Sequence, residues 1–360
     1  MILNSVVVEQ TIDRDVRGRF AKELVLVRVP SKAHPDGVPL AMIRKRDADA
    51  GGGTLGTVVL VHGYGQNRYA WHLPSRSLFN HLVKAGFDVF NLELRGHGRS
   101  RHLGAHPPSQ ACDFVREDVP AAIEVIQKIT GPRPVFLVGH SLGGLVAYAS
   151  AAHLQGAIAG VVSLGSPYQF TRGSWALATF GTAMLALDRR VSFGHGGIEL
   201  KPIMESVRLL RGFIESPIFP LPIRGFAPGS LEPQVLAQHM SLAMDVGSVA
   251  VLRNMFLAAA EARLGGHCLG ELSPYAAAFE ALTDLPLLVV AGTRDDLAPP
   301  ASVEPAYLRS RSRDRTYRTF PRGHLDLLVG RDSPQTIWPL LEAWLKRRAR
   351  LVAGVDRAAA

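Results

Sequence analysis

The stretch that decides the fold is VFLVGHSLGGLVAYA, residues 135–149. Its first four residues form an apolar run typical of a buried strand, and the five residues from Leu145 follow a helical pattern. Between the two lies GHSLG, a G-x-S-x-G sequence centred on Ser141. A sharp strand-to-helix turn holds such a serine out at the top of a sheet, and its glycines remove the Cβ clashes that the turn would create. We therefore predict that Ser141 is a nucleophile.

Further apolar runs alternate with helical patterns along the chain, and each run is continuous. Continuous runs suit strands buried on both faces, and strands separated by helices are typical of a mostly parallel sheet with helices on both sides. Before them, residues 23–29 and 38–44 flank the turn at 35–37, which predicts an antiparallel hairpin at the sheet edge. The expected fold is α/β with about eight strands. Its six core runs lie at 57–61, 87–91, 135–138, 160–163, 287–291 and 316–320.

The alternation of apolar runs with helical patterns stops near residue 168 and resumes near residue 284. Helical patterns broken by Gly and Pro fill the interval. They indicate a helical cap inserted between the strands expected at 160–163 and 287–291, the sixth and seventh when the hairpin is counted, and overhanging the strand ends. A last helix is expected near Ser333-Pro334, because a serine cap precedes a proline at the first helical position. The predicted division is a first part of the core at 1–167, the cap at 168–283, a second part of the core at 284–350 and a tail at 351–360.

Two of the strand ends offer the partners that a serine nucleophile needs. The fifth core run leads into a loop that carries Asp295, and the sixth leads into His324. A histidine can take the serine proton, and a carboxylate can orient that histidine. The chain order Ser141, Asp295, His324 differs from the chymotrypsin and subtilisin arrangements. Asp296 and Asp326 lie close in sequence and stay open as alternatives for the orienting acid.

Backbone N–H groups aimed at the developing oxyanion would complete such a site, and each contributes about 3 kcal/mol to lowering the barrier. We assign one to Leu142, which follows the nucleophile at a helix start. The other is assigned to Tyr64, in the HGYG loop after the first core run. His62, Gly63 and His140 are expected to support the site, with His62 acting through hydrogen bonds within its loop.

No metal or organic cofactor is expected. His97, His102 and His106 lie in one loop, but no carboxylate or cysteine there completes a ligand set. Cys112 and Cys268 lie far apart and lack metal-ligand spacing, so neither a zinc site nor a disulfide framework is indicated.

Five motifs together resemble the α/β-hydrolase superfamily, within it the serine esterase and lipase branch that includes monoacylglycerol lipases and lysophospholipases. They are HGYG at 62–65, ELRGHGRS at 93–100, GHSLGG at 139–144, GTRDDLAP at 292–299 and GHLDLL at 323–328. The resemblance implies an α/β-hydrolase fold with an inserted cap. It also implies a serine hydrolase that cleaves carboxylic esters through an acyl-enzyme on Ser141. The segment 323–330 further resembles polyhydroxyalkanoate synthases, whose nucleophile is a cysteine where this chain has Ser141.

The same residues leave two alternatives open: an acyltransferase that uses the same triad, and a non-catalytic homologue that uses its pocket to bind a ligand. The expected substrate is a small lipid-like ester, such as an acylglycerol or a lysophospholipid, because apolar residues of the cap suit an acyl chain. Those residues are Phe170, Trp175, Phe180, Met184, Leu185, Phe213, Ile218, Phe219, Met255 and Phe256.

Charge and hydropathy bear on partners and location. The formal net charge is +9, and residues 309–350 hold eleven Lys and Arg against four Asp and Glu. No nucleic-acid-binding motif accompanies this excess, so nucleic acid is not an expected partner. The uncharged segment 173–187 is too short to span a bilayer. Two interpretations of the basic C-terminal region stay open: a solvated face, or attraction to anionic lipid headgroups beside segment 173–187. Residues 1–20 lack the pattern of a signal peptide, so the expected location is cytoplasmic, with peripheral membrane contact.

Overall fold

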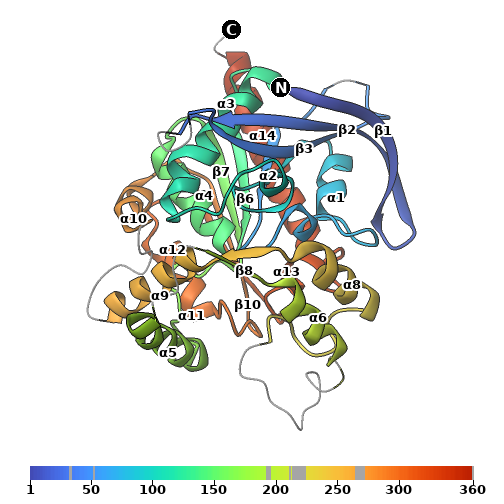
Figure 1. Cartoon of the computed structure of the whole chain (residues 1–360). Coiled ribbons are helices and arrows are strands. Elements are labelled where there is room, and N and C mark those ends of the chain that lie inside the picture. The colour runs from blue at the N-terminus through green and yellow to red at the C-terminus, as the bar shows by residue number, and fades with distance from the viewer. Residues whose placement is uncertain are drawn as a thin grey trace.

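A computed structural model describes residues 1–31, 35–51, 53–191, 196–210, 212, 224–263 and 272–358. A nine-stranded sheet runs through it in the order β1-β2-β3-β5-β4-β6-β7-β10-β11 (Figure 1). Neighbouring strands from β5 to β11 are parallel, whereas β1, β2, β3 and β5 pair antiparallel. The strands are β1 (Ile2–Asp13), β2 (Val16–Val29), β3 (Val38–Asp47), β4 (Thr57–Val61), β5 (Asp88–Glu93), β6 (Val135–His140), β7 (Ile158–Leu164), β10 (Leu287–Gly292) and β11 (Arg315–Phe320).

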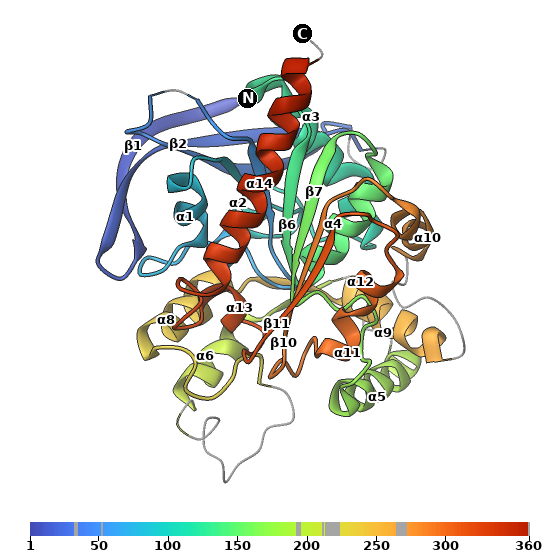
Figure 2. The same ribbon diagram turned by 180° about the vertical axis from the view of Figure 1, so that it is seen from behind.

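Helices cover both faces of the sheet. α3 and α4 lie in front of it in Figure 1, and α14 crosses the opposite face in Figure 2, where α1 packs beside it. The core helices are α1 (Leu78–Lys84), α2 (Gly98–His102), α3 (Val119–Thr130), α4 (Leu142–His153), α10 (Ser273–Ala281), α11 (Pro300–Val303), α12 (Pro305–Arg309), α13 (Asp326–Val329) and α14 (Ile337–Ala358), with a 3-10 turn η1 (Arg68–Ala70) and a π-helical turn η2 (Phe114–Asp118).

Burial on both faces explains the continuous apolar runs. Every residue of β4, β6 and β10 is buried, because each strand is sandwiched between helices. α4 is buried along its whole length except at His153, since α10 packs on its outer side. The Tyr148 and Phe279 rings lie 4.7 Å apart in that contact. The helix that follows the candidate nucleophile is therefore held between the sheet and a second helix.

The sheet confirms the expected α/β architecture and the antiparallel hairpin of β2 and β3. The sheet has nine strands where about eight are expected, because β1 pairs along nearly its whole length with β2. β1 is not predicted from the sequence because most of its residues are exposed, so no buried apolar run marks it. The expected start of the last helix is also early. The segment after Ser333 forms turns, and α14 begins at Ile337.

After β7 the chain leaves the sheet. It rejoins the sheet at β10, which pairs with β7. The elements between β7 and α10 lie at the lower end of the molecule in Figure 1. They are α5 (Trp175–Val191), β8 (Gly197–Glu199), α6 (Lys201–Leu209), α8 (Pro233–Gln238), the π-helical turn η3 (His239–Ala243), β9 (Val246–Ser248) and α9 (Val249–Arg263). This segment is mostly helical, as expected, and β8 and β9 add a small antiparallel sheet that was not expected.

The boundaries at 168, 283 and 350 stay predictions, and two observations bear on them. α10, inside the expected cap range, packs on α4 of the core. α14 continues to Ala358, so residues 351–358 extend a helix rather than form a separate tail. Three of the apolar residues expected in the cap lie outside the described residues: Phe213, Ile218 and Phe219. In the described part of the chain, no helix combines the length and apolar character needed to cross a membrane.

Candidate active site

Ser141 sits on a strained turn between β6 and α4. Its φ of 54° and ψ of −122° are rare for a residue with a side chain, which marks the position as one that the surrounding structure enforces. Close packing explains both flanking glycines. A Cβ on Gly139 would lie 2.3 Å from the Gly143 carbonyl oxygen, and one on Gly143 would lie 2.1 Å from the carbonyl oxygen of Val61. The G-x-S-x-G pattern is thus required by backbone contacts here.

Asp295 and His324 form a buried pair at the ends of β10 and β11. His324 Nδ1 lies 2.7 Å from Asp295 Oδ2, and both residues are at most 5% exposed. The other carboxylate oxygen, Oδ1, accepts from the N–H groups of Leu297 at 2.9 Å and Ala298 at 2.7 Å. Asp295 is therefore fixed in position, and the His324 tautomer that donates from Nδ1 leaves Nε2 free to accept a proton.

The turn at Ser141 and this pair lie at the carboxyl ends of parallel strands, with β7 between β6 and β10. Ser141 N–H donates to the Leu164 carbonyl at 3.0 Å. The next residue, Gly165, packs on the pair, since a Cβ there would lie 3.2 Å from both His324 Nδ1 and Asp295 Oδ2. The structure therefore brings the three residues of the expected triad to one edge of the sheet.

His140 connects β6 to the histidine of this pair. Its Nε2 lies 3.2 Å from the His324 carbonyl oxygen, and the two rings lie 4.6 Å apart. Burial, followed by the charge of His324, lowers the pKa of His140 well below its usual value. A neutral His140 can donate only one proton, and the contact with a carbonyl oxygen puts it on Nε2. His140 thus holds the backbone of His324.

The other two carboxylates that the sequence left open have different surroundings. Asp326 Oδ2 accepts from the N–H groups of Gly323 at 2.7 Å and Ala227 at 2.9 Å, so it braces the loop around His324. Burial raises the pKa of Asp326. Asp296 is partly exposed, and among the described residues His324 makes its carboxylate contact with Asp295. The geometry therefore favours Asp295 as the orienting acid.

The HGYG loop lies against Ser141. A Cβ on Gly63 would lie 3.1 Å from Ser141 Cβ. His62 Nε2 accepts from the Leu94 N–H at 3.2 Å, so its proton is on Nδ1, which lies 3.0 Å from the Gly63 carbonyl oxygen. Burial, and then the charge of His97, lower the pKa of His62 to about 3. His62 is therefore neutral and supports the loop through a hydrogen bond at each of its ring nitrogens.

The two expected oxyanion donors follow Ser141 and Gly63 in the chain, and Gly63 itself packs against Ser141. Leu142 is the first residue of α4. Its N–H has no acceptor within the helix and lies at the positive end of the helix dipole. Tyr64 follows Gly63, and its hydroxyl donates to the Ser248 carbonyl at 2.9 Å. Anchoring of the Tyr64 side chain on β9 fixes the backbone whose N–H is the second candidate donor.

Gln66 is a site residue that the sequence reading missed. Its Oε1 accepts from the Gly63 N–H at 3.2 Å and lies 3.4 Å from His140 Nδ1, while its Nε2 lies 3.4 Å from His239 Nε2 of η3. Burial, and then the charge of His324, lower the pKa of His239 to about 4. Gln66 directly follows the HGYG motif, and that position was the signal in the sequence that could have identified it as a site residue.

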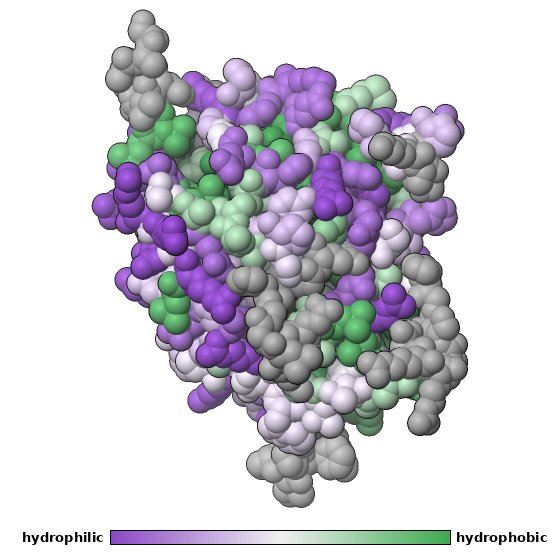
Figure 3. Space-filling model, turned by 90° about the vertical axis from the view of Figure 1, so that its left-hand side faces the viewer, coloured by the Kyte–Doolittle hydropathy of each residue, from purple (hydrophilic) through white to green (hydrophobic). Residues whose placement is uncertain are grey.

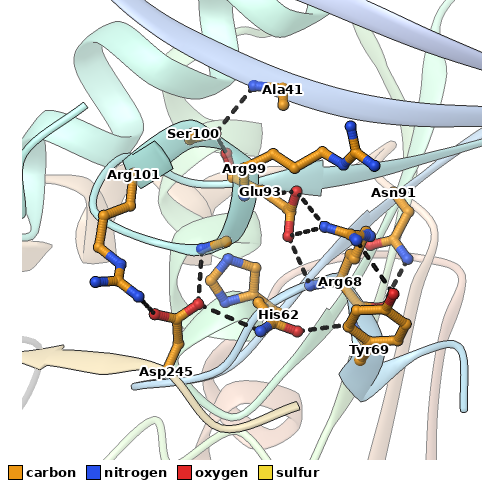
Figure 4. A network of polar contacts seen from close by, with 12 residues as sticks. Ala41, His62, Arg68, Tyr69, Asn91, Glu93, Arg99, Ser100, Arg101 and Asp245 are labelled. Atoms are coloured by element: carbon orange, nitrogen blue, oxygen red, sulfur yellow. Dashed lines mark hydrogen bonds and ion pairs between the residues drawn. The ribbon is translucent and has the colours of Figure 1, made fainter. Parts of the chain in front are cut away.

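Asp245, which precedes β9, was also missed, and no sequence motif marks it. Its backbone N–H donates to the Gly65 carbonyl at 2.8 Å, and its Oδ2 accepts from the Gly98 N–H at 2.7 Å. Its other oxygen lies 3.1 Å from a guanidinium nitrogen of Arg101 (Figure 4). One buried carboxylate thus joins the cap to the loops that follow β4 and β5. Across the described ranges, no three His, Cys, Asp or Glu side chains gather as a metal site would require.

Comparison with known proteins supports the fold. Residues 56–188 match the profile of the family described as alpha/beta hydrolase fold. An esterase from Thermogutta terrifontis has a solved structure that superposes with a TM-score of 0.60 at 19% identity, over 91% of this chain and 99% of that one. The chain has the α/β-hydrolase fold.

Curated relatives of this protein include enzymes named as esterases and lipases. The monoacylglycerol lipase of Mycolicibacterium smegmatis is 28% identical over 266 residues, which cover 74% of this chain and 79% of that protein. The pimeloyl-[acyl-carrier protein] methyl ester esterase of Vibrio cholerae is 33% identical over 119 residues, which cover 33% of this chain and 40% of the relative. Some relatives are matched over only about a quarter of their own length.

Proposed function

We propose that this α/β-hydrolase is a serine hydrolase that cleaves carboxylic esters through an acyl-enzyme on Ser141. The observation that carries the proposal is the buried 2.7 Å contact between His324 Nδ1 and Asp295 Oδ2, beside a serine on a strained turn. The curated relatives named as esterases and lipases support the same chemistry.

In the proposed reaction, His324 Nε2 takes the Ser141 proton as Oγ attacks the ester carbonyl. The oxyanion receives hydrogen bonds from the Leu142 and Tyr64 N–H groups. The alcohol then leaves with the proton from His324, and Oγ keeps the acyl group. Water, deprotonated by His324, releases the acid and restores the serine. Asp295 holds the tautomer and stabilises the cationic ring throughout.

We propose a lipid-like ester, such as an acylglycerol or a lysophospholipid, as the substrate. Apolar side chains of the cap support this. Phe170 and Phe256 pack 5.1 Å apart in a small core between α5 and α9. Outward from that core, Trp175 is 76% exposed and Phe180 is 54% exposed. Exposed aromatic residues of this kind suit contact with acyl chains or with a lipid surface.

The arrangement of the helices bears on where the expected membrane contact lies. The sequence suggested that segment 173–187 meets a membrane beside the basic C-terminal region. The last turns of α14 lie at the opposite end of the molecule from α5 in both views (Figures 1 and 2). On the side shown in Figure 3, hydrophobic residues occur in separate patches among polar ones. We therefore propose that any membrane contact involves α5 without the end of α14.

The test is hydrolysis of p-nitrophenyl esters from acetate to palmitate by the wild type and by Ser141→Ala. We expect activity that is greatest on medium or long chains and absent from the variant. A fluorophosphonate probe should add its mass to the wild type and not to Ser141→Ala. Turnover retained in the variant would refute the role of Ser141, and a strong preference for acetate would refute the lipid-like substrate. Adding an alcohol acceptor shows whether the acyl group goes to water or to the alcohol.

A further inference from the structure

A cavity separate from the candidate active site lies between the β1–β2 hairpin and the core. Its volume is about 360 Å³, within the range of small-ligand pockets, and none of the residues proposed for catalysis lines it. Residues of β1, β2, β3, η1 and α1 contribute to its walls. Its charge is unbalanced, since it is lined by one carboxylate, on Glu9, and by five basic side chains: Arg17, Lys22, Lys45, Arg68 and Arg99.

Only two of the five basic side chains are neutralised by a carboxylate. Arg17 pairs with Glu9 at 3.2 Å, and Arg68 pairs with Glu93 at 2.9 Å. In the part of the chain that the structure describes, no carboxylate comes within ion-pair distance of the other three, namely Lys22, Lys45 and Arg99. Figure 4 shows Arg99 directed away from Asp245, on the same side as Arg68 and Tyr69.

Lys45 is buried without a counter-charge. Its Nζ donates to Asn80 Oδ1 at 2.7 Å and to Gln10 Oε1, and lies 3.4 Å from His72 Nε2. The Phe79 ring centroid lies 4.7 Å away. All of these groups accommodate an ammonium ion, and none of them carries negative charge.

The cations also act on one another. Burial, and then the charges of Lys22 and Arg68, lower the pKa of Lys45 to about 6. Burial, and then the charges of Arg68 and Arg99, lower the pKa of Lys22. Side chains that disfavour each other's charge produce a positive potential in the space between them, and an anion placed there relieves it.

We propose that this pocket is a binding site for a phosphate-bearing anion. Lys22 and Arg99 supply uncompensated charge, Lys45 can take up a proton when an anion binds, and a doubly charged phosphate needs more than one cation near it. The Tyr69 hydroxyl accepts from Arg68 at 3.2 Å and keeps its own proton for donation to a phosphate oxygen. The phosphate could belong to free phosphate or to a lipid headgroup, and the chemistry of recognition is the same.

The experiment is isothermal titration calorimetry of the full chain at constant ionic strength, with inorganic phosphate in one arm and a water-soluble short-chain phosphatidic acid in the other. The pocket variant is Lys22→Gln with Arg99→Gln. Lys22 is half-buried and Arg99 is exposed, so neither change removes a core contact. The control is Lys128→Gln with Arg350→Gln, which removes the same charge from exposed positions outside the pocket. Circular dichroism confirms folding of each variant.

We expect saturable binding of at least one probe to the wild type and, equally, to Ser141→Ala. The pocket variant should bind at least about tenfold more weakly, since two charge-assisted contacts are lost, and the control should match the wild type. Binding of phosphate identifies the free anion as sufficient, and binding of the phosphatidic acid alone identifies a headgroup. No saturable binding of either probe, or equal binding by the pocket and control variants, overturns the proposal. Because the readout is binding, failure of the esterase proposal leaves this result unchanged.

Discussion

Gly143 packs so tightly against Val61 that a Cβ on the glycine would lie 2.1 Å from the Val61 carbonyl oxygen. The contact joins the first turn of α4 to the end of β4. It also brings the HGYG loop, which follows β4, to the residue before this glycine, Leu142. The two candidate oxyanion donors therefore depend on one backbone contact.

Gly143→Ala should lower the free energy of unfolding by about 2–4 kcal/mol, because backbone atoms cannot yield to the added methyl group. Ester hydrolysis should fall with it, since the loop and α4 are forced apart. Urea denaturation and p-nitrophenyl butyrate hydrolysis measure the two effects. Gly53→Ala is the control, because a Cβ at Gly53 meets nothing within 4 Å. Equal stability and rate in the two variants would contradict this account.

Asp295→Asn should reduce kcat by about 10³–10⁴-fold, because an amide stabilises the wrong tautomer of His324 and gives no charge to its cationic form. Asp296→Asn is the matched control on the adjacent, partly exposed residue, and it should change kcat by no more than a few-fold. Steady-state kinetics on a single soluble ester separate the two. A larger loss in Asp296→Asn than in Asp295→Asn would show that the acid is misassigned.

Buried neutral histidines should make stability fall in acid. The ordinary pKa of a histidine is 6.5, and in the fold that of His239 is about 4. Between these values the unfolded chain binds a proton that the folded chain excludes, so the free energy of unfolding decreases as pH falls, by up to about 1.4 kcal/mol per pH unit for this group.

His239→Gln should therefore flatten the dependence of unfolding free energy on pH between about 6.5 and 4, relative to the wild type. The exposed His106 is the matched control, and His106→Gln should keep the wild-type slope. Urea denaturation at a series of pH values gives the slopes. Identical slopes in the wild type and His239→Gln would show that His239 is protonated in the folded state.

Asp245→Asn should loosen the cap. The substitution weakens the hydrogen bond from the Gly98 N–H and the ion pair with Arg101, so we expect a loss of about 2–3 kcal/mol of stability and faster proteolytic cleavage between β7 and β10. Asp284→Asn is the control, because that side chain is 81% exposed in a surface pair. Cleavage at the control rate would mean that other contacts hold the cap.

The parts of the site that the sequence predicted are those tied to strand ends. Ser141 and Asp295 each follow a buried strand, whereas His324 follows β11, which has no buried residue. Parallel strands put their carboxyl ends on one edge, so the proximity of the three residues follows from the order of the strands. The missed parts depend on contacts between segments far apart in sequence. Gln66 and Asp245 belong to this class, because each acts on loops that no local pattern connects to it. β8 and β9, with three residues each, are too short for any periodicity to appear.

The way the chain leaves and rejoins the sheet limits how caps can be exchanged between relatives by recombination. β7 ends at the edge that carries the site, whereas β10, parallel to it, begins at the other edge. α10 returns the chain between these edges, packed on the helix that follows Ser141. A chimaera with a breakpoint inside β10 would replace this support together with the cap. Crossovers just after β7 and just before α10 should instead transfer substrate preference while each parent keeps its own catalytic scaffold.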